Sequence, residues 1–595
     1  MQLTTLDWGF IFAFFALSLG IGIYASKRSS QNASEFFLSG RNMPWWLLGI
    51  SMVATTFSAD TPNLVTDIVR KDGVAGNWAW WAFLLTGMLT VFVYARLWRR
   101  SGVLTDLEFY ELRYSGAAAA FLRGFRAVYL GVFFNILVMA TVCLAAIKIG
   151  SVLLGLSPVQ TLLLSSIVTV AYSTLGGLRG IILTDFFQFT LAMIGTIWAA
   201  MYIVDMPEIG GLSNLLNHEN VKPHLNLIPD MNTQRDLFFS LLIIPLAVQW
   251  WASYYPGAEP GGGGYIAQRM LAAKDEKNAI WATLLFNVAH YALRPWPWML
   301  IALASMVVFP DLESIRRAFP NVDPSVVNDD LAYPAMISFL PKGLLGLVIA
   351  SLIAAFMSTI STHLNWGASY LTNDVYKRFL APQASEKELV NIGRIATVLL
   401  MFASATVALY MDNAKEVFDL IVLVGAGTGL IFILRWFWWR INAYSEIAAM
   451  VISVLVALYF KYMHVEKLGF EPLENHIQLL SGVGITTIGW LLVTFLTRPT
   501  DEKTLLSFYK KIKPAKDGWL PIVQNAMANG ELQPTEIESG KLPIQILCML
   551  IGSVMVYAAL FSVGFWLYGE WGDALLATGI STACFVAIIW LWKKL

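Results

Sequence analysis

Long apolar stretches alternate with short polar connections along almost the whole of this 595-residue chain. A helix needs about 20 predominantly apolar residues to cross a lipid bilayer. The pattern therefore predicts an all-α polytopic membrane protein that is surrounded by the lipid bilayer. The fifteen predicted spans are residues 4–26, 45–68, 76–98, 120–153, 157–174, 180–204, 236–256, 278–308, 342–370, 391–411, 416–438, 442–461, 476–496, 545–568 and 573–592.

The composition excludes several other classes of protein. Hydrophobic residues make up 57% of the chain and charged residues 13%, which is too apolar to surround a soluble core with a polar surface. The formal net charge of zero provides no general attraction for nucleic acid. No polar stretch is long enough for a soluble catalytic domain, so an enzyme is not expected. Cys143, Cys548 and Cys584 all lie in apolar stretches, which indicates neither a disulfide framework nor a thiolate metal site.

The positions of Lys and Arg predict how the chain is oriented in the membrane. The first span has no basic segment before it and is followed by Lys27 and Arg28, so we expect it to be retained with the N-terminus outside. The later odd-numbered connections, one of which contains Arg269, are more basic than the even-numbered ones. Because positive residues concentrate in cytoplasmic loops, we expect a multi-pass protein of the cell (inner) membrane with a cytoplasmic C-terminus.

Two of the predicted spans cannot be continuous helices. Residues 54–63 place four hydroxyls, Asp60 and Pro62 at mid-membrane depth, where irregular backbone is tolerated only if it lines a cavity or is buried in protein. A simple kink is the alternative there. The span at 236–256 runs into two prolines and the four glycines 261–264, which break a helix more severely.

The second break falls five spans after the first. Because five is odd, the second set of five spans starts from the opposite side of the membrane, which is the geometry of an inverted repeat in secondary transporters. We therefore expect a 5+5 inverted repeat with one additional N-terminal and four additional C-terminal helices. The predicted parts are an N-terminal helix and cytoplasmic loop at 1–44, repeats at 45–204 and 236–438, an extracellular loop at 205–235, and the C-terminal helices at 439–595 with a cytoplasmic loop at 497–544.

A cluster of hydroxyl residues interrupts the apolar span at 342–370. On a helix Ala355, Ser358 and Thr359 lie at i, i+3 and i+4 and therefore share one face. That face could hold a small cation. The alternatives are that the hydroxyls bond to carbonyls of their own helix or let a neighbouring helix approach closely.

Charged residues inside predicted spans are candidates for function, because they are costly in a membrane. Asp185 lies one turn inside its span, although Arg179 of the preceding turn could simply pair with it. Arg294 could meet Asp60, Glu259 or an anionic group of a solute. Span 76–98 is rich in tryptophan, and Trp80 could either stack on a solute or anchor the helix at the membrane interface.

Several longer motifs identify a family resemblance. They are FFLSGRNMPWW at 36–46, LTDLEFYELRYS at 104–115, STLGGLRGIILTDFFQ at 173–188, YIAQRMLAAK at 265–274, and LPKGLLGLVIASLIAAFMSTIS at 340–361 with the following NDVYKRF. Together they resemble the sodium:solute symporter family, whose members share the LeuT-type fold. The resemblance implies a sodium site made by the backbone carbonyls of Ala54, Phe57 and Ala355 and the hydroxyls of Ser358 and Thr359. It also implies that Asp185 belongs to a second sodium site or a sodium exit path.

The chain departs from the sugar-transporting branch of that family at the positions that contact the solute. Where that branch has a Gln, a Glu and an Asn, positional matching gives Thr61, Trp80 and Ala252. Arg294 falls near a Lys of the sugar site. We therefore disfavour a hexose pocket of that kind. The candidate residues of the solute cavity are Thr61, Trp80, Ala252, Tyr255, Glu259 and Arg294.

These observations predict a sodium-coupled symporter that imports a small organic solute by alternating access. A solute sensor or a channel that shares the fold without coupled transport is the alternative. Neutral carbonyl and hydroxyl oxygens suit a hard cation such as Na⁺ and bind it weakly enough for release.

Overall fold

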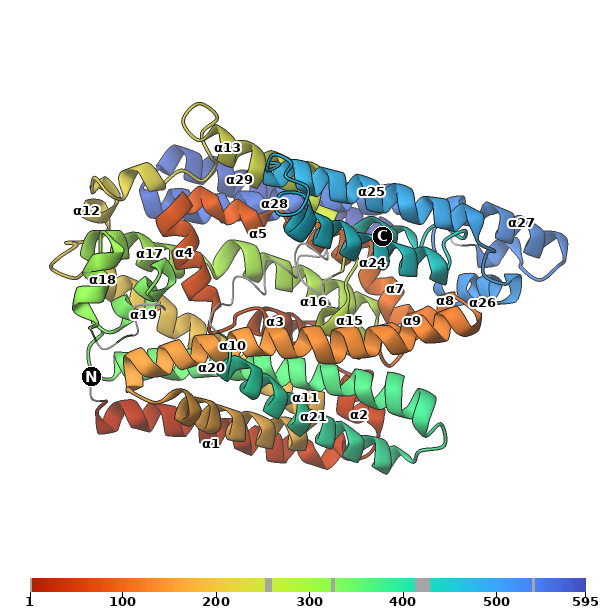
Figure 1. Ribbon diagram of the computed structural model, residues 1–595, viewed down its shortest axis with the longest axis horizontal. Helices are drawn as coiled ribbons and strands as arrows, with labels where there is room; N and C mark the ends of the chain where they lie inside the picture. The colour runs from red at the N-terminus through yellow and green to blue at the C-terminus, as the bar shows by residue number, and fades with distance from the viewer. Residues whose placement is uncertain (1–2, 252–258, 321, 323–326, 412–427, 538–540) are drawn as a thin grey trace.

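The computed structural model describes residues 3–251, 259–320, 322, 327–411, 428–537 and 541–595. Within these residues the regular elements are helices, apart from one isolated bridge between Met43 and Ala273. Most of the helices run along the longest axis of the molecule (Figure 1). Eleven of the described helices are long and apolar enough to cross a membrane.

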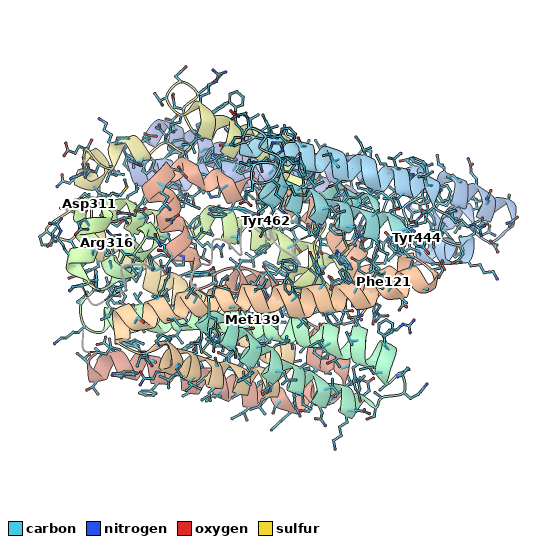
Figure 2. The ribbon with its side chains drawn as sticks, in the orientation of Figure 1. Phe121, Met139, Asp311, Arg316, Tyr444 and Tyr462 are labelled. Atoms are coloured by element: carbon cyan, nitrogen blue, oxygen red, sulfur yellow. The ribbon has the colours of Figure 1, made fainter. Side chains whose placement is uncertain are left out.

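The exposed side chains fit a bundle surrounded by lipid. Phe121 of α9 (Gly116–Val128) is 58% exposed and Tyr444 of α24 (Ala443–Leu458) is 53% exposed, whereas Met139 of α10 (Asn135–Ile149) is buried. Asp311 and Arg316 lie at one end of the bundle (Figure 2). Large apolar side chains can face hydrocarbon, while charged groups need water at the ends.

One long helix contains two of the predicted spans. α11 (Pro158–Val204) has 47 residues, and Gly177 in its middle has a φ of 53°. A Cβ atom at Gly177 would lie 2.7 Å from the carbonyl oxygen of Phe36. Glycine is required at this turn because of both the left-handed backbone and the close approach.

The first predicted break is present. α3 (Trp45–Thr55) ends, and α4 (Thr61–Asp72) begins after Asp60 with Pro62 in its first turn. Proline is favourable at that position because the first N–H groups of a helix have no partner within the helix.

The second broken span is described on both sides of its break. It contains α13 (Arg235–Leu237), a π-helical turn and α14 (Ile244–Ala247), and the chain continues in α15 (Gly264–Ala272). The intervening residues 252–258 lie outside the described part of the chain. Most of the predicted span at 416–438 also lies outside it, and α23 (Gly429–Leu434) is its described end.

α20 (Leu344–Ser369) is the central helix, and nearly all of its residues are buried. It packs against α11, which also contacts α1 (Thr5–Ser29) and α3. α16 (Glu276–Val288) covers another side of α3, and α17 (Trp296–Val308) packs against α4. This packing brings the end of α3 and the hydroxyl face of α20 together.

Four long helices follow the core: α24, α25 (Asn475–Leu496), α28 (Leu542–Tyr568) and α29 (Trp571–Leu591). The predicted loop at 497–544 contains two further helices, α26 (Glu502–Ile512) and α27 (Leu520–Ala528). Both are too short to cross a membrane, and each buries apolar residues on one face.

Candidate ion site and solute cavity

The hydroxyl face of α20 contacts the end of α3. Thr359 Oγ1 donates a 2.8 Å hydrogen bond to the backbone carbonyl oxygen of Thr55, the last residue of α3. The side chains of Thr55 and Thr362 also meet, with 3.0 Å between their hydroxyl oxygens. Thr359 thus bonds to a neighbouring helix. The alternative that its hydroxyl bonds to a carbonyl of its own helix predicts a different partner.

The other candidate sodium ligands belong to the same two elements. Ala54 and Phe57 flank the end of α3, and Ala355 lies one turn before Thr359 on α20. The carbonyl oxygen of Ala54 accepts a 3.1 Å bond from the Phe57 N–H group. The Phe57 ring packs against Trp298 with 4.7 Å between ring centroids. All of these residues are buried.

Asp185 is completely buried and links α11 to both elements. Its Oδ1 accepts a 2.7 Å hydrogen bond from Ser358, and its Oδ2 accepts a 2.5 Å bond from Ser51 of α3. Its charged partner is Arg269 of α15, with 3.8 Å between the nitrogen and oxygen atoms. Asp185 therefore pairs with Arg269 and not with Arg179, the partner that its own turn offered.

The sequence position of Arg269 predicts a cytoplasmic connection and indicates no functional role for it. In the structure it is completely buried. Its guanidinium donates to Thr362 at 2.7 Å and to Ser51 at 3.2 Å. The available signal was an arginine inside the YIAQRMLAAK motif beside a broken span, but its position next to a predicted loop concealed it.

Two of the candidate cavity residues lie around the π-helical turn η10 (Ala289–Leu293), which continues α16. The Trp80 ring stacks on Tyr291 with 5.8 Å between centroids and an angle of 22°. Arg294 follows this turn and donates a 3.1 Å hydrogen bond to the Thr56 hydroxyl. Trp80 is therefore a half-buried side chain that packs against the core, next to residues close to Arg294 in the chain.

The remaining cavity candidates differ in their surroundings. Thr61 Oγ1 accepts a 3.2 Å hydrogen bond from the Ser58 N–H group at the start of α4. Glu259, one of the three partners considered for Arg294, forms a buried ion pair with Arg126 of α9. Ala252 and Tyr255 lie outside the described residues.

These oxygens can bind a hard, monovalent cation. Hydroxyl and carbonyl groups from α3 and α20 are uncharged, and the neighbouring carboxylate of Asp185 is balanced by Arg269. Two helices interrupted at membrane depth, with polar groups gathered at one interruption, define a secondary transporter.

Comparison with known proteins identifies the transporter family to which this chain belongs. The sequence model named "Sodium:solute symporter family" matches residues 36–453, and the chain belongs to that family. The sodium/glucose cotransporter of Vibrio parahaemolyticus is 26% identical over 76% of this chain and 84% of that protein. The sodium/sialic acid symporter SiaT of Proteus mirabilis is 24% identical over 77% of this chain and 90% of that protein.

A solved structure supports the fold independently. A Na⁺-coupled sialic acid symporter, described in a substrate-bound outward-open state, aligns with a TM-score of 0.66 and 21% identity. The alignment covers 84% of this chain and the whole of that chain. The predicted LeuT-type fold is confirmed. This protein is a multi-pass membrane protein and a sodium-coupled symporter of a small organic solute.

Proposed function

We propose that the coupling sodium ion binds between the end of α3 and the hydroxyl face of α20. Its ligands are the carbonyl oxygens of Ala54, Phe57 and Ala355 and the hydroxyl oxygens of Ser358 and Thr359. The hydrogen bond between Thr359 and Thr55 carries this proposal, because it joins α20 to the end of α3, where the first core helix is interrupted. The uncharged ligands agree with an ion that must be released into a low-sodium cytosol.

Asp185 acts on this site through Ser358. The Ser358 hydroxyl donates its proton to the carboxylate, which leaves the oxygen lone pairs available to a cation. Asp185 also serves as a second sodium ligand or as a step on the sodium exit path. Its acidic side chain supports both roles.

The organic solute occupies a cavity lined by Thr61, Trp80, Ala252, Tyr255, Glu259 and Arg294. The packing of Trp80 and Arg294 around η10 supports the central part of this assignment. Within this proposal, Glu259 is held by its ion pair with Arg126 of α9.

Import proceeds by alternating access between the repeats 45–204 and 236–438, with the N-terminus outside the cell and the C-terminus in the cytoplasm. One sodium ion crossing about 100 mV supplies about 2.3 kcal/mol, and a roughly tenfold gradient adds about 1.4 kcal/mol. One ion per cycle could therefore sustain on the order of several-hundredfold accumulation of the solute.

The experiment compares sodium-driven uptake into proteoliposomes for the parent protein and the double variant Ser358→Ala and Thr359→Ala. We expect the concentration of sodium that gives half-maximal uptake to rise at least about tenfold, because two of five ligands are lost. Ser369→Ala is the matched control, since Ser369 is a buried hydroxyl of the same helix whose described hydrogen bond goes to Trp366 of that helix. Unchanged sodium dependence in the double variant would refute the proposed site.

A further inference from the structure

Adjacent threonines bond the end of α3 to two different helical segments. The Thr55 carbonyl oxygen accepts the 2.8 Å hydrogen bond from Thr359 of α20. The hydroxyl oxygen of Thr56, the next residue, lies 2.9 Å from His290 Nδ1 and accepts a 3.1 Å hydrogen bond from Arg294 Nη1. His290 lies in η10, and Arg294 follows that turn directly. One peptide unit therefore joins the hydroxyl face of α20 to η10.

The bonds around Thr56 assign the tautomer of His290. The Arg294 guanidinium can only donate, and its Nη2 atom lies 3.5 Å from His290 Nε2. Nε2 is therefore the acceptor, and Nδ1 carries the hydrogen that is donated to Thr56. The Thr56 hydroxyl donates its own hydrogen within α3, where the Val53 carbonyl oxygen lies at 3.0 Å. The hydrogen and both lone pairs of this hydroxyl are thus used, so a methyl group in its place would remove an acceptor that two donors share.

His290 contacts both central candidates of the solute cavity. Its imidazole ring meets the Trp80 ring edge to face, with 5.6 Å between centroids and an angle of 90°. Its Nε2 atom is the acceptor for Arg294. The side chain is buried, and it also packs against the neighbouring Tyr291 ring with 4.5 Å between centroids. A displacement of Thr56 therefore reaches Trp80 and Arg294 through a single ring.

Phe57 makes a second connection between the break and Arg294. Its ring packs against Trp298 of α17, and the Arg294 guanidinium carbon lies 5.4 Å from the centre of the Trp298 ring. The carbonyl groups of Ala54 and Phe57 are two of the proposed sodium ligands. A cation that holds both carbonyls removes backbone freedom from the residues between them, which include Thr56. Such an ion would therefore restrain both the hydroxyl and the ring that connect the break to Arg294.

We infer that Thr56 and His290 are positioning residues that couple sodium binding to the solute cavity. Sodium at the end of α3 orders Thr56, and Thr56 and His290 together hold Arg294 and Trp80 in the arrangement that receives the solute. The inference rests on the proposed sodium ligands and on the proposed place of Arg294 and Trp80 in the cavity. The solute then binds more tightly to the sodium-bound protein, and sodium binds more tightly to the solute-bound protein, because coupling between two sites is reciprocal.

The first test uses sodium alone as the probe. Hydrogen–deuterium exchange of the purified full chain is measured by mass spectrometry in sodium chloride and in potassium chloride, for peptides from α20 and from residues 286–300 around η10. We expect sodium to slow exchange at least about threefold in both regions of the parent protein, because ordering the break makes local opening rarer. Protection of α20 without protection of η10 would overturn the inference. Absence of protection in α20 would overturn the proposed sodium site and, with it, this inference.

The second test removes the hydroxyl of Thr56 and keeps the shape of the side chain. In Thr56→Val we expect sodium to protect α20 as in the parent protein, while the slowing of exchange at η10 falls below about 1.5-fold. Thr56→Ser keeps the hydroxyl and should restore the protection of η10. A purely structural role of Thr56 would lower Tm without separating the two regions. Thr66→Val is the matched control, because Thr66 is a buried hydroxyl of α4 that donates a 2.8 Å bond to Pro62 of its own helix. Full protection of η10 in Thr56→Val would overturn the inference.

The coupling and the proposed sodium site fail in different ways. The side chain of Thr56 is not among the proposed ligands, so the sodium concentration that half-protects α20 should change less than about threefold in Thr56→Val. The same concentration should rise at least about tenfold in the double variant Ser358→Ala and Thr359→Ala. A responsive α20 beside an unresponsive η10 in the parent protein refutes the coupling alone, whereas an unchanged response of α20 in the double variant refutes the sodium site.

Discussion

At the scale of single residues, Ser358 and Asp185 are joined by a buried hydrogen bond. Ser358 lies at the face of α20 that meets α3, and its hydroxyl donates a 2.7 Å hydrogen bond to the Asp185 carboxylate. Ser51 approaches that carboxylate from α3 and Arg269 from α15. A change in the charge of Asp185 therefore reaches the proposed sodium ligands directly.

Asp185→Asn should both weaken the sodium response and destabilise the protein. The substitution leaves the completely buried Arg269 without its carboxylate, and breaking a buried pair in this way costs about 3 kcal/mol or more. Tm measured over a sodium titration reports both effects.

The double variant Asp185→Asn and Arg269→Gln separates those effects. It removes both charges, so it should recover part of the lost Tm but not the sodium response. If Asp185→Asn alone kept the Tm and the sodium response of the parent protein, the proposed role of Asp185 would be contradicted.

At the scale of helices, aromatic contacts hold the segment that contains α26 and α27 against the core. Trp519, at the start of α27, is completely buried, and its indole donates a 3.0 Å bond to the carbonyl oxygen of Trp436. The Phe508 ring of α26 stacks on it at 5.4 Å, and the Arg113 guanidinium lies 4.8 Å from its ring centre. α26 and α27 are therefore part of the packed molecule.

Trp519→Ala should lower the free energy of unfolding by about 3 to 5 kcal/mol. It removes a large buried ring and leaves a cavity that the surrounding side chains fill only in part. Thermal unfolding in detergent provides the measurement. Leu520→Ala is the control, because the adjacent Leu520 is 41% exposed and its loss should have a much smaller effect. Equal effects of the two substitutions would mean that the segment does not depend on this contact.

The glycine run is held between several elements. Asp106, in the connection between α7 (Ala95–Ser101) and α8 (Phe109–Arg113), accepts a 2.9 Å bond from the Gly264 N–H group and a 2.6 Å bond from the Tyr370 hydroxyl. Trp98 donates a 2.8 Å bond to the carbonyl oxygen of Gly261. A Cβ atom at Gly261, where φ is 85°, would lie 2.9 Å from the Tyr94 ring. The glycines thus permit close packing at the start of α15.

Asp106 should make the stability of the protein depend on pH. Burial raises the pKa of Asp106 to about 6, and the nearby Glu259 adds to this effect. The folded state therefore binds a proton at Asp106 more tightly than the unfolded state does. The contribution of Asp106 to stability is fully present below the ordinary pKa range of a carboxyl group and is lost as the pH rises through about 6.

Tm measured for the parent protein and for Asp106→Asn tests this dependence. The advantage of the parent protein should decrease from about pH 5 to about pH 8, by an amount on the order of 2 kcal/mol. The variant provides the reference because it lacks the titrating group. A difference that is constant with pH, or that increases, would contradict the assignment.

The two ends of the whole molecule should face different compartments. α12 (Leu212–Asn217) and α27 lie at opposite ends of the bundle (Figure 1). Asn217→Cys should react with an impermeant maleimide applied to intact cells, whereas Asn529→Cys should react only after permeabilisation. Both positions are exposed, and the three native cysteines lie within apolar spans. The reverse labelling pattern would invert the proposed orientation.

The sequence by itself determined the class of architecture. The apolar stretches, the breaks near Pro62 and in the glycine run, and the shared face of Ser358 and Thr359 are local patterns, because helix periodicity and helix breaking act over a few residues. The motifs then indicated the family that the comparison confirmed.

Only the tertiary structure decided which charged and polar groups meet. Ser51 and Asp185 are 134 positions apart in the chain, and Arg126 and Glu259 are 133 positions apart. Neither the burial of Arg269 beside Asp185 nor the pairing of Glu259 with Arg126 follows from a local pattern. Ion pairing depends on distances between helices, and these are set by how α3, α11, α15 and α20 pack together.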